Sequence, residues 1–245
     1  MVKPEAGATL NPAVASISNI VMTQDRPQDR PDAPLEDRRE PMFNAPWPGL
    51  LAAASILVPH LTLGRASDET LYGLALVPAR VLGGDPMGLI TSLFIHGGWP
   101  HALMNAVFAL AFGAPVARFL GLGARGGALF AFFYIACGIL AGLGYAAVHP
   151  SSLEPLIGAS GAVAGLMGAA ARLMDRPGQL SGLFAPRVLS LGLGWLIVNL
   201  VLAVIGNFPA FGPGRIAWEA HLFGFAAGAL LIGPISRLVV NPETH

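Results

Sequence analysis

Two polar residues, Ser160 and His221, lie near the start of apolar runs where a polar side chain is costly. Ser160 belongs to Gly-Ala-Ser-Gly (158–161), and His221 to Ala-His-Leu-Phe-Gly (220–224). Polar residues inside membrane segments mark functional sites by default. A serine that meets a histidine is typical of a nucleophile and its general base, because imidazole accepts the hydroxyl proton near neutral pH. The pair predicts serine hydrolase chemistry inside a bilayer.

A second polar pair, His101 and Asn105, lies in a third apolar run. Their i, i+4 spacing places both on one helical face. Alone, this pair fits a structural role equally well. With Ser160 and His221 at a similar depth, it predicts two side-chain donors for an oxyanion hole, completed by backbone N–H groups where the Ser160 helix begins.

The composition indicates a membrane protein. Hydrophobic residues make up 54% of the chain and charged residues 11%, against about 25% charged in soluble domains. The formal net charge of zero gives no indication of nucleic-acid binding. The single cysteine, Cys137, cannot form an internal disulfide and is interpreted as a small packing residue.

The chain divides into three parts. Residues 1–44 carry many charges and several prolines, which predicts a disordered cytoplasmic tail without a secretory signal. Residues 45–240 form the membrane domain, and residues 241–245 a C-terminal tail. About 20 apolar residues cross a bilayer, and six runs qualify as spans: 47–63, 99–117, 127–148, 157–174, 188–206 and 216–236.

The predicted fold is an all-α bundle of six transmembrane helices. The apolar stretch 71–95, between the first and second spans, is broken by prolines and glycines and predicts a partly embedded loop. Near the spans, six arginines fall on one side and three on the other. This bias places both termini in the cytoplasm, so that Ser160 and His221 lie just below the outer face.

Small residues at i, i+4 let helices approach closely. Gly161 and Gly165 form such a pair on the Ser160 span, and Gly224 and Gly228 another on the His221 span. Close packing of these two helices would hold Ser160 within hydrogen-bond reach of His221.

A Ser–His dyad is favoured over a triad. The only lysine, Lys3, lies in the tail, which excludes a Ser–Lys dyad. Glu219 should point away from His221 on its helix, so it is not expected to complete a triad. Asn199 is interpreted as an interhelical hydrogen-bonding residue, Trp195 as a packing or interface residue, and His60 and His149 as surface groups.

These residues resemble the rhomboid family of intramembrane serine proteases over about residues 45–240. The matching stretches are FIHGGWPHALMN (94–105), FG (112–113), GASGAVAG (158–165) and AHLFGFAAG (220–228). The resemblance implies that Ser160 is the nucleophile, His221 the base, and His101 and Asn105 oxyanion donors. It implies supporting roles for Gly158, Gly161, Gly224 and Gly228, and a structural role for His96.

The resemblance further implies cleavage of a membrane protein in or beside its transmembrane helix, with no metal and no other cofactor. The six spans suit the basic bacterial form, hence an inner membrane. Two positions depart from the family pattern. Ala164 stands where many members carry an aromatic that stacks on the catalytic histidine, and Pro78-Ala-Arg80 replaces a common Trp-Arg pair.

Rival functions fit the sequence less well. A metal-dependent intramembrane protease needs His-Glu-xx-His, which is absent from the sequence, and an aspartyl protease needs two carboxylates within spans. A transporter would show charges along a path across the membrane. The alternative from a different class is a catalytically silent rhomboid-like protein that binds membrane clients. Substrate identity and oligomeric state stay open.

Overall fold

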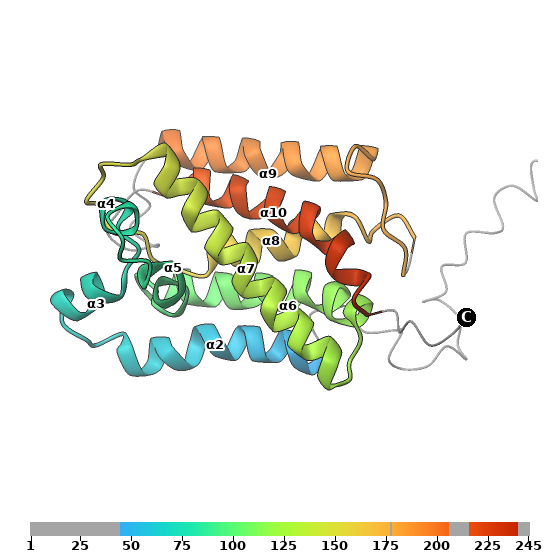
Figure 1. Cartoon of the computed structure of the whole chain (residues 1–245), viewed down its shortest axis with the longest axis horizontal. Helices are drawn as coiled ribbons and strands as arrows, with labels where there is room; N and C mark the ends of the chain where they lie inside the picture. The colour runs from blue at the N-terminus through green and yellow to red at the C-terminus, as the bar shows by residue number, and fades with distance from the viewer. Residues whose placement is uncertain (1–44, 177, 206–215, 240–245) are drawn as a thin grey trace, which may run out of the picture. The chain divides into compact units, whose positions relative to one another are not determined.

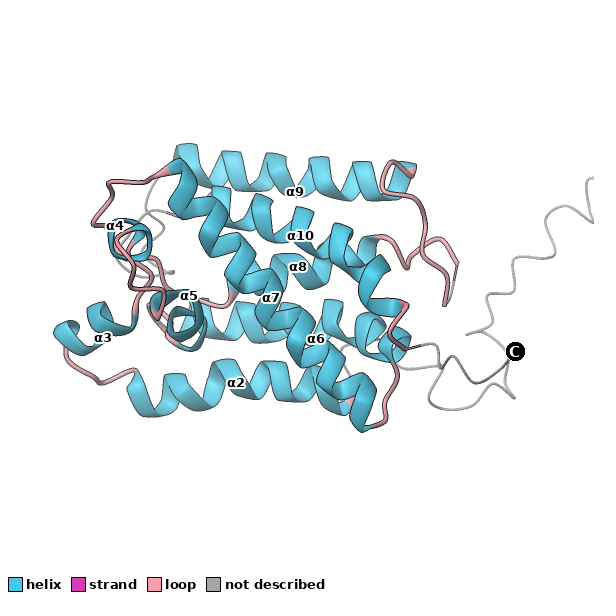
Figure 2. Cartoon of the chain, viewed as in Figure 1, coloured by secondary structure: helices cyan, strands magenta, loops and turns pink. Residues whose placement is uncertain are grey.

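The computed structural model describes residues 45–176, 178–205 and 216–239. Within these ranges the chain is helical, and the β structure is limited to one isolated bridge between Leu76 and Leu156 (Figure 2). The expectation of an all-helical fold is therefore confirmed for the described residues. The predicted tails at 1–44 and 241–245 lie outside the described residues.

Six main helices overlap the six predicted spans. They are α2 (Trp47–Leu63), α6 (Trp99–Leu120), α7 (Ala124–Val148), α8 (Ser160–Ala171), α9 (Pro186–Ile205) and α10 (Trp218–Ser236). Four of them, α6, α7, α9 and α10, are long and apolar enough to cross a membrane. With 17 and 12 residues, α2 and α8 are shorter. At about 1.5 Å per residue, α8 reaches roughly 18 Å, well short of a 30 Å hydrocarbon core.

The predicted loop between the first two spans folds into short helices at one end of the bundle (Figure 1). These are α3 (Asp68–Leu74), α4 (Pro78–Leu82), α5 (Gly88–Thr91) and a 3-10 turn, η3 (Ser92–Phe94). Arg80 forms an ion pair with Asp85, which lowers the pKa of that carboxyl. Through the Leu76–Leu156 bridge, the loop is tied to the segment that leads into α8.

The short helix α8 lies at the centre of the bundle, with α6 on one side and α10 on the other (Figure 1). Every residue of α8 after Ser160 is buried, and nearly all of them are small. A Cβ added to Gly224 would lie 2.1 Å from the Gly161 carbonyl oxygen, and one added to Gly228 would lie 1.8 Å from that of Gly165. The α8 and α10 backbones are therefore in direct contact at both predicted glycine pairs.

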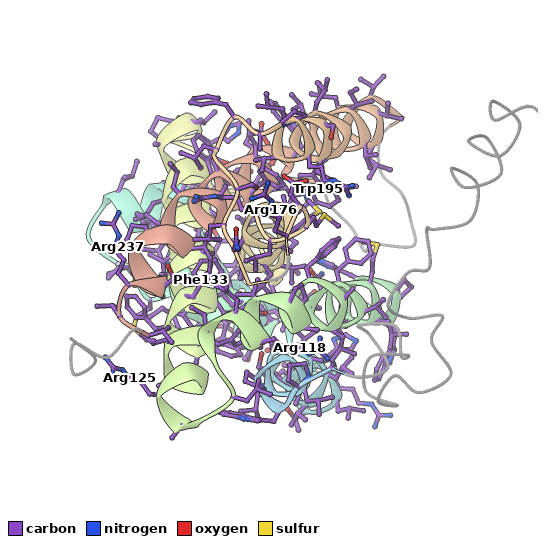
Figure 3. The ribbon with its side chains drawn as sticks, turned by 90° about the vertical axis from the view of Figure 1, so that its right-hand side faces the viewer. Arg118, Arg125, Phe133, Arg176, Trp195 and Arg237 are labelled. Atoms are coloured by element: carbon purple, nitrogen blue, oxygen red, sulfur yellow. The ribbon has the colours of Figure 1, made fainter. Side chains whose placement is uncertain are left out.

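The opposite end of the bundle carries arginines. Arg118 is in the last turn of α6, Arg125 in the first turn of α7, and Arg237 directly follows α10. Figure 3 looks onto this end and shows Arg176 there as well. The clustering matches the basic side on which the predicted orientation depends.

Candidate active site

Ser160 is the first residue of α8. The predicted span began at residue 157, so Ser160 lies at the helix N-terminus rather than three residues inside the helix. Gly158 explains the difference, because its φ of 114° is a left-handed conformation that does not continue into a helix. At this position the backbone N–H groups of the first turn have no carbonyl partner within the helix.

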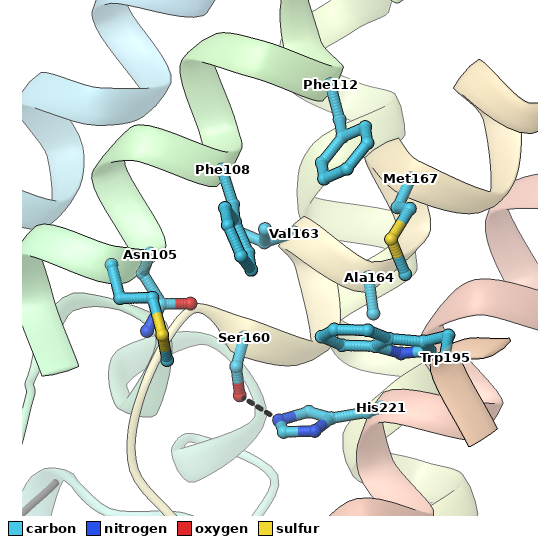
Figure 4. Close-up of a pocket in the computed structure, with 10 residues that line it drawn as sticks. Asn105, Phe108, Phe112, Ser160, Val163, Ala164, Met167, Trp195 and His221 are labelled. Carbon is cyan, nitrogen blue, oxygen red and sulfur yellow. Dashed lines mark hydrogen bonds between the residues drawn. The ribbon is translucent and has the colours of Figure 1, made fainter. Parts of the chain in front are cut away.

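Ser160 and His221 are in hydrogen-bond contact. The distance from Ser160 Oγ to His221 Nε2 is 2.8 Å (Figure 4). The two residues come from α8 and α10, the helices that meet at the glycine pairs. The arrangement places an imidazole nitrogen where it can accept the serine proton.

Asn199 is the residue that sequence reasoning undervalued. It lies in α9, is buried, and its Oδ1 is 2.5 Å from His221 Nδ1. The prediction of an interhelical hydrogen bond was right, but the sequence did not identify His221 as the partner. The available signal was a lone amide in an apolar span. Glu219, by contrast, pairs with His149 at 3.1 Å.

Trp195, one turn before Asn199, lies against the same imidazole. The Trp195 and His221 rings are 5.8 Å apart between centroids and inclined by 39°. Ala164 faces the same space, and Figure 4 shows the indole between Ala164 and His221. The aromatic that the α8 position lacks is thus supplied by α9.

The two predicted oxyanion donors lie in different places. Asn105 is buried, lines the pocket with Ser160 and His221, and donates from Nδ2 to the His101 carbonyl at 2.9 Å. His101 does not belong to the pocket lining. Its ring packs on the backbone before Ser160, where a Cβ on Gly158 would lie 2.7 Å from His101 Nε2. Of the two predicted donors, only Asn105 therefore lines the same pocket as the Ser160–His221 pair.

His96 lies in the connection to α6 and is buried. Its Nε2 accepts a hydrogen bond of 3.2 Å from the Ala159 N–H, which fixes the residue before Ser160. Burial, followed by the neighbouring His101 and His60, lowers the pKa of His96 to about 3. The imidazole is therefore neutral, as acceptance at Nε2 requires.

The prediction that His60 is a surface group is wrong. His60 is 7% exposed, and its ring packs edge-on against Trp99 and His96. Leu71, from the short helices of the loop, borders the same small space. In the described part of the chain, no group of three or more His, Cys, Asp or Glu residues is arranged to hold a metal ion.

The pocket beside Ser160 is small and apolar. Its volume is about 40 Å³, enough for a water molecule. Its lining consists of Met104, Asn105, Phe108, Phe112, Ser160, Val163, Ala164, Met167, Trp195 and His221. Phe108 of α6 and Trp195 of α9 are in edge contact at 6.5 Å between ring centroids, so aromatic rings from both helices border the pocket.

Comparison with known proteins gives one family. The family model described as the Rhomboid domain matches residues 83–238. The chain is 30% identical to "Putative rhomboid protease YdcA" of Bacillus subtilis, over 62% of this chain and 68% of that protein. It is 27% identical to RHOMBOID-like protein 5 and 28% identical to the chloroplastic RHOMBOID-like protein 9, both of Arabidopsis thaliana. These alignments cover 69% and 60% of this chain, but only 55% and 33% of the plant proteins.

Proposed function

This chain belongs to the rhomboid family, and we propose that it is an intramembrane serine endopeptidase. The proposed reaction cleaves a peptide bond in or next to a transmembrane helix of a membrane-protein substrate. The observation that carries the proposal is the 2.8 Å contact between Ser160 Oγ and His221 Nε2. Such a contact is the geometry of a nucleophile paired with its base.

The proposed chemistry has two steps. His221 Nε2 accepts the Ser160 proton as Oγ attacks the scissile carbonyl carbon, and then returns that proton to the departing amine. A water molecule, activated by the same imidazole, hydrolyses the acyl-serine and releases the second product.

The negative charge that develops on the carbonyl oxygen needs donors. Asn105 Nδ2 is the side-chain donor beside the serine, and the first N–H groups of α8 add backbone donors with the positive end of the helix dipole. His101 remains a proposed donor, although its ring packs on Gly158 and would have to turn toward the pocket.

The proposed setting is a bilayer crossed by six spans, with both termini cytoplasmic and the site near the outer face. This matches the basic form of the family in a bacterial inner membrane. The start of α8 and the start of α10 lie away from the arginine-bearing end of the bundle, which supports access of water from the outer side.

Labelling with a fluorophosphonate probe tests the proposal. The purified protein is solubilised in detergent, and wild type is compared with Ser160→Ala, His221→Ala and Asn105→Ala. We expect no labelling of the first two variants. Asn105→Ala should react 10²–10³ times more slowly, the effect of losing one oxyanion donor, about 2.7–4 kcal/mol.

Cleavage of a generic transmembrane substrate provides the second readout. Folded wild-type protein that neither reacts with the probe nor cleaves such a substrate would refute the protease and favour a client-binding protein. If Asn105→Ala is labelled at the wild-type rate, Asn105 is not an oxyanion donor, but the proposed Ser160–His221 dyad is unaffected.

A further inference from the structure

The hydrogen bonds around Asn199 determine which of its amide atoms faces His221. Asn199 Nδ2 is 2.8 Å from the Trp195 carbonyl oxygen, one turn earlier in α9. A carbonyl oxygen only accepts hydrogen bonds, so the amide nitrogen must face it. The amide oxygen, Oδ1, is then the atom that contacts His221 Nδ1 at 2.5 Å.

This orientation fixes the tautomer of His221. Because Oδ1 of Asn199 only accepts, the hydrogen of this contact belongs to His221 Nδ1. A neutral imidazole carries one N–H, so Nε2 has its lone pair free, facing Ser160 Oγ at 2.8 Å. The opposite tautomer would place a lone pair against the Asn199 oxygen, and its Nε2–H would donate to Ser160 Oγ. In that state Nε2 could not accept the serine proton.

We infer that Asn199 is a positioning residue for His221, which holds the imidazole in the tautomer that can accept the Ser160 proton. The inference rests on the proposed serine protease function and adds a third group from a third helix. Trp195 assists from the same helix, because its indole lies against the face of the imidazole and limits rotation of the ring. Asn199 contacts neither Ser160 nor the pocket in the described contacts, so its effect passes through His221.

The placement on α9 gives this arrangement a mechanical consequence. Among the four long apolar helices, α9 is the least buried in the described bundle. Only 11% of its apolar stretch is buried, against 44–50% for the other three helices. The orientation of the base thus depends on contacts from the helix with the weakest packing. The base is correctly set when α9 is docked against α10.

The test uses two substitutions at one site. Asn199→Leu keeps a similar size and removes the acceptor, whereas Asn199→Asp keeps an oxygen toward His221 Nδ1. Val198→Ala is the matched control, since Val198 directly precedes Asn199 in α9 and is half exposed. Fluorophosphonate labelling of the full chain in detergent is followed over a range of probe concentrations.

We expect the limiting labelling rate of Asn199→Leu to fall about 10- to 100-fold, the size of the loss when a metal-bound histidine loses the hydrogen-bond partner that orients it. Its half-saturating probe concentration should not change. Asn199→Asp should keep most of the rate, and Val198→Ala all of it. A wild-type rate in folded Asn199→Leu would overturn the inference, as would an equal loss in folded Asn199→Leu and Asn199→Asp.

Nitrogen NMR supplies a readout that depends neither on the Asn199 variants nor on enzyme activity. In ¹⁵N-histidine-labelled wild type, the signals of His221 are assigned by comparison with His221→Ala. We expect a protonated Nδ1 and an unprotonated Nε2, and the reverse would overturn the inference. If wild type fails to label while Nδ1 is protonated, the protease proposal fails and the Asn199 contact stands.

Discussion

The α8–α10 contact gives the sharpest prediction about how the fold controls the site. Gly228→Ala adds one methyl group whose carbon would lie 1.8 Å from the Gly165 carbonyl oxygen. Ordinary contacts begin at 3.4 Å, so the two helices must separate locally by about 1.6 Å. The obstacle is backbone, which cannot turn aside as a side chain can. The same separation applied to Ser160 and His221 would stretch their 2.8 Å contact to about 4.4 Å, beyond a hydrogen bond.

The free-energy cost of overpacking this contact is partly offset by the higher helix propensity of alanine. Overpacking of a close contact costs about 1–3 kcal/mol, and a rigid backbone neighbour places Gly228→Ala at the upper end. The better helix propensity of alanine returns about 1 kcal/mol. The net loss of about 2 kcal/mol corresponds to a melting temperature about 4–8 °C lower for a domain of this size. Labelling of Ser160 should fall together with stability.

The protein provides its own reporter for this measurement. Cys137 is the single cysteine, is fully buried, and faces α8 at Gly165. A fluorogenic maleimide therefore reacts when the α7–α8 packing opens on heating. The control is Gly194→Ala on α9, where an added Cβ meets nothing within 4 Å. It should melt at or above the wild-type temperature. A wild-type melting temperature and labelling rate in Gly228→Ala would refute the close-contact reasoning.

Two further predictions concern the surroundings of the dyad. Ala164→Phe should slow labelling, because its ring would enter the space that Trp195 occupies above His221, and adding Trp195→Ala should restore part of the rate; no recovery in the double variant would contradict this. The folded-state pKa of His96 is about 3 against about 6.5 unfolded, so the unfolded state binds the extra proton between these values. The contribution of His96 to the free energy of unfolding should be complete above pH 6.5 and fall by roughly 2 kcal/mol by pH 5. When unfolding is followed by tryptophan fluorescence, His96→Asn should lose less free energy of unfolding over that range. An equal loss would show that His96 is not the source of the pH dependence.

Much of the helical framework could be predicted because a membrane span requires a run of about 20 apolar residues. The apolar run 47–63 matches α2 at both ends, since a charged or broken segment begins on either side. The glycine pairs were predicted to bring α8 and α10 together because a small side chain at i, i+4 leaves a path for another backbone. The start of α8 was misplaced by three residues, because composition alone does not show that Gly158 adopts a positive φ.

The partners of Asn199, Trp195 and His60 could not be predicted, for a common physical reason. Apolar composition says that a helix is buried in lipid or protein but does not set its rotation about its own axis. α9 has apolar residues all around, so the side carrying Asn199 was not distinguished from the lipid-facing side. His60 is covered by Trp99 and by the short helices of the loop, whose path depends on long-range contacts such as Leu76–Leu156.

An amide at position 199 suits the proposed role of His221 as a base inside a membrane. A carboxylate there would also fix the tautomer, and it would stabilise the imidazolium more strongly. It would, however, place a charge on the least buried of the long helices, where insertion of an aspartate costs about 2.5–3.5 kcal/mol. The amide orients His221 through one neutral acceptor and anchors itself to the Trp195 carbonyl. On this reasoning an amide provides less electrostatic stabilisation of the imidazolium but leaves α9 easier to insert. In the proposed mechanism, stabilisation of the transition state then falls mainly to Asn105 and the first turn of α8.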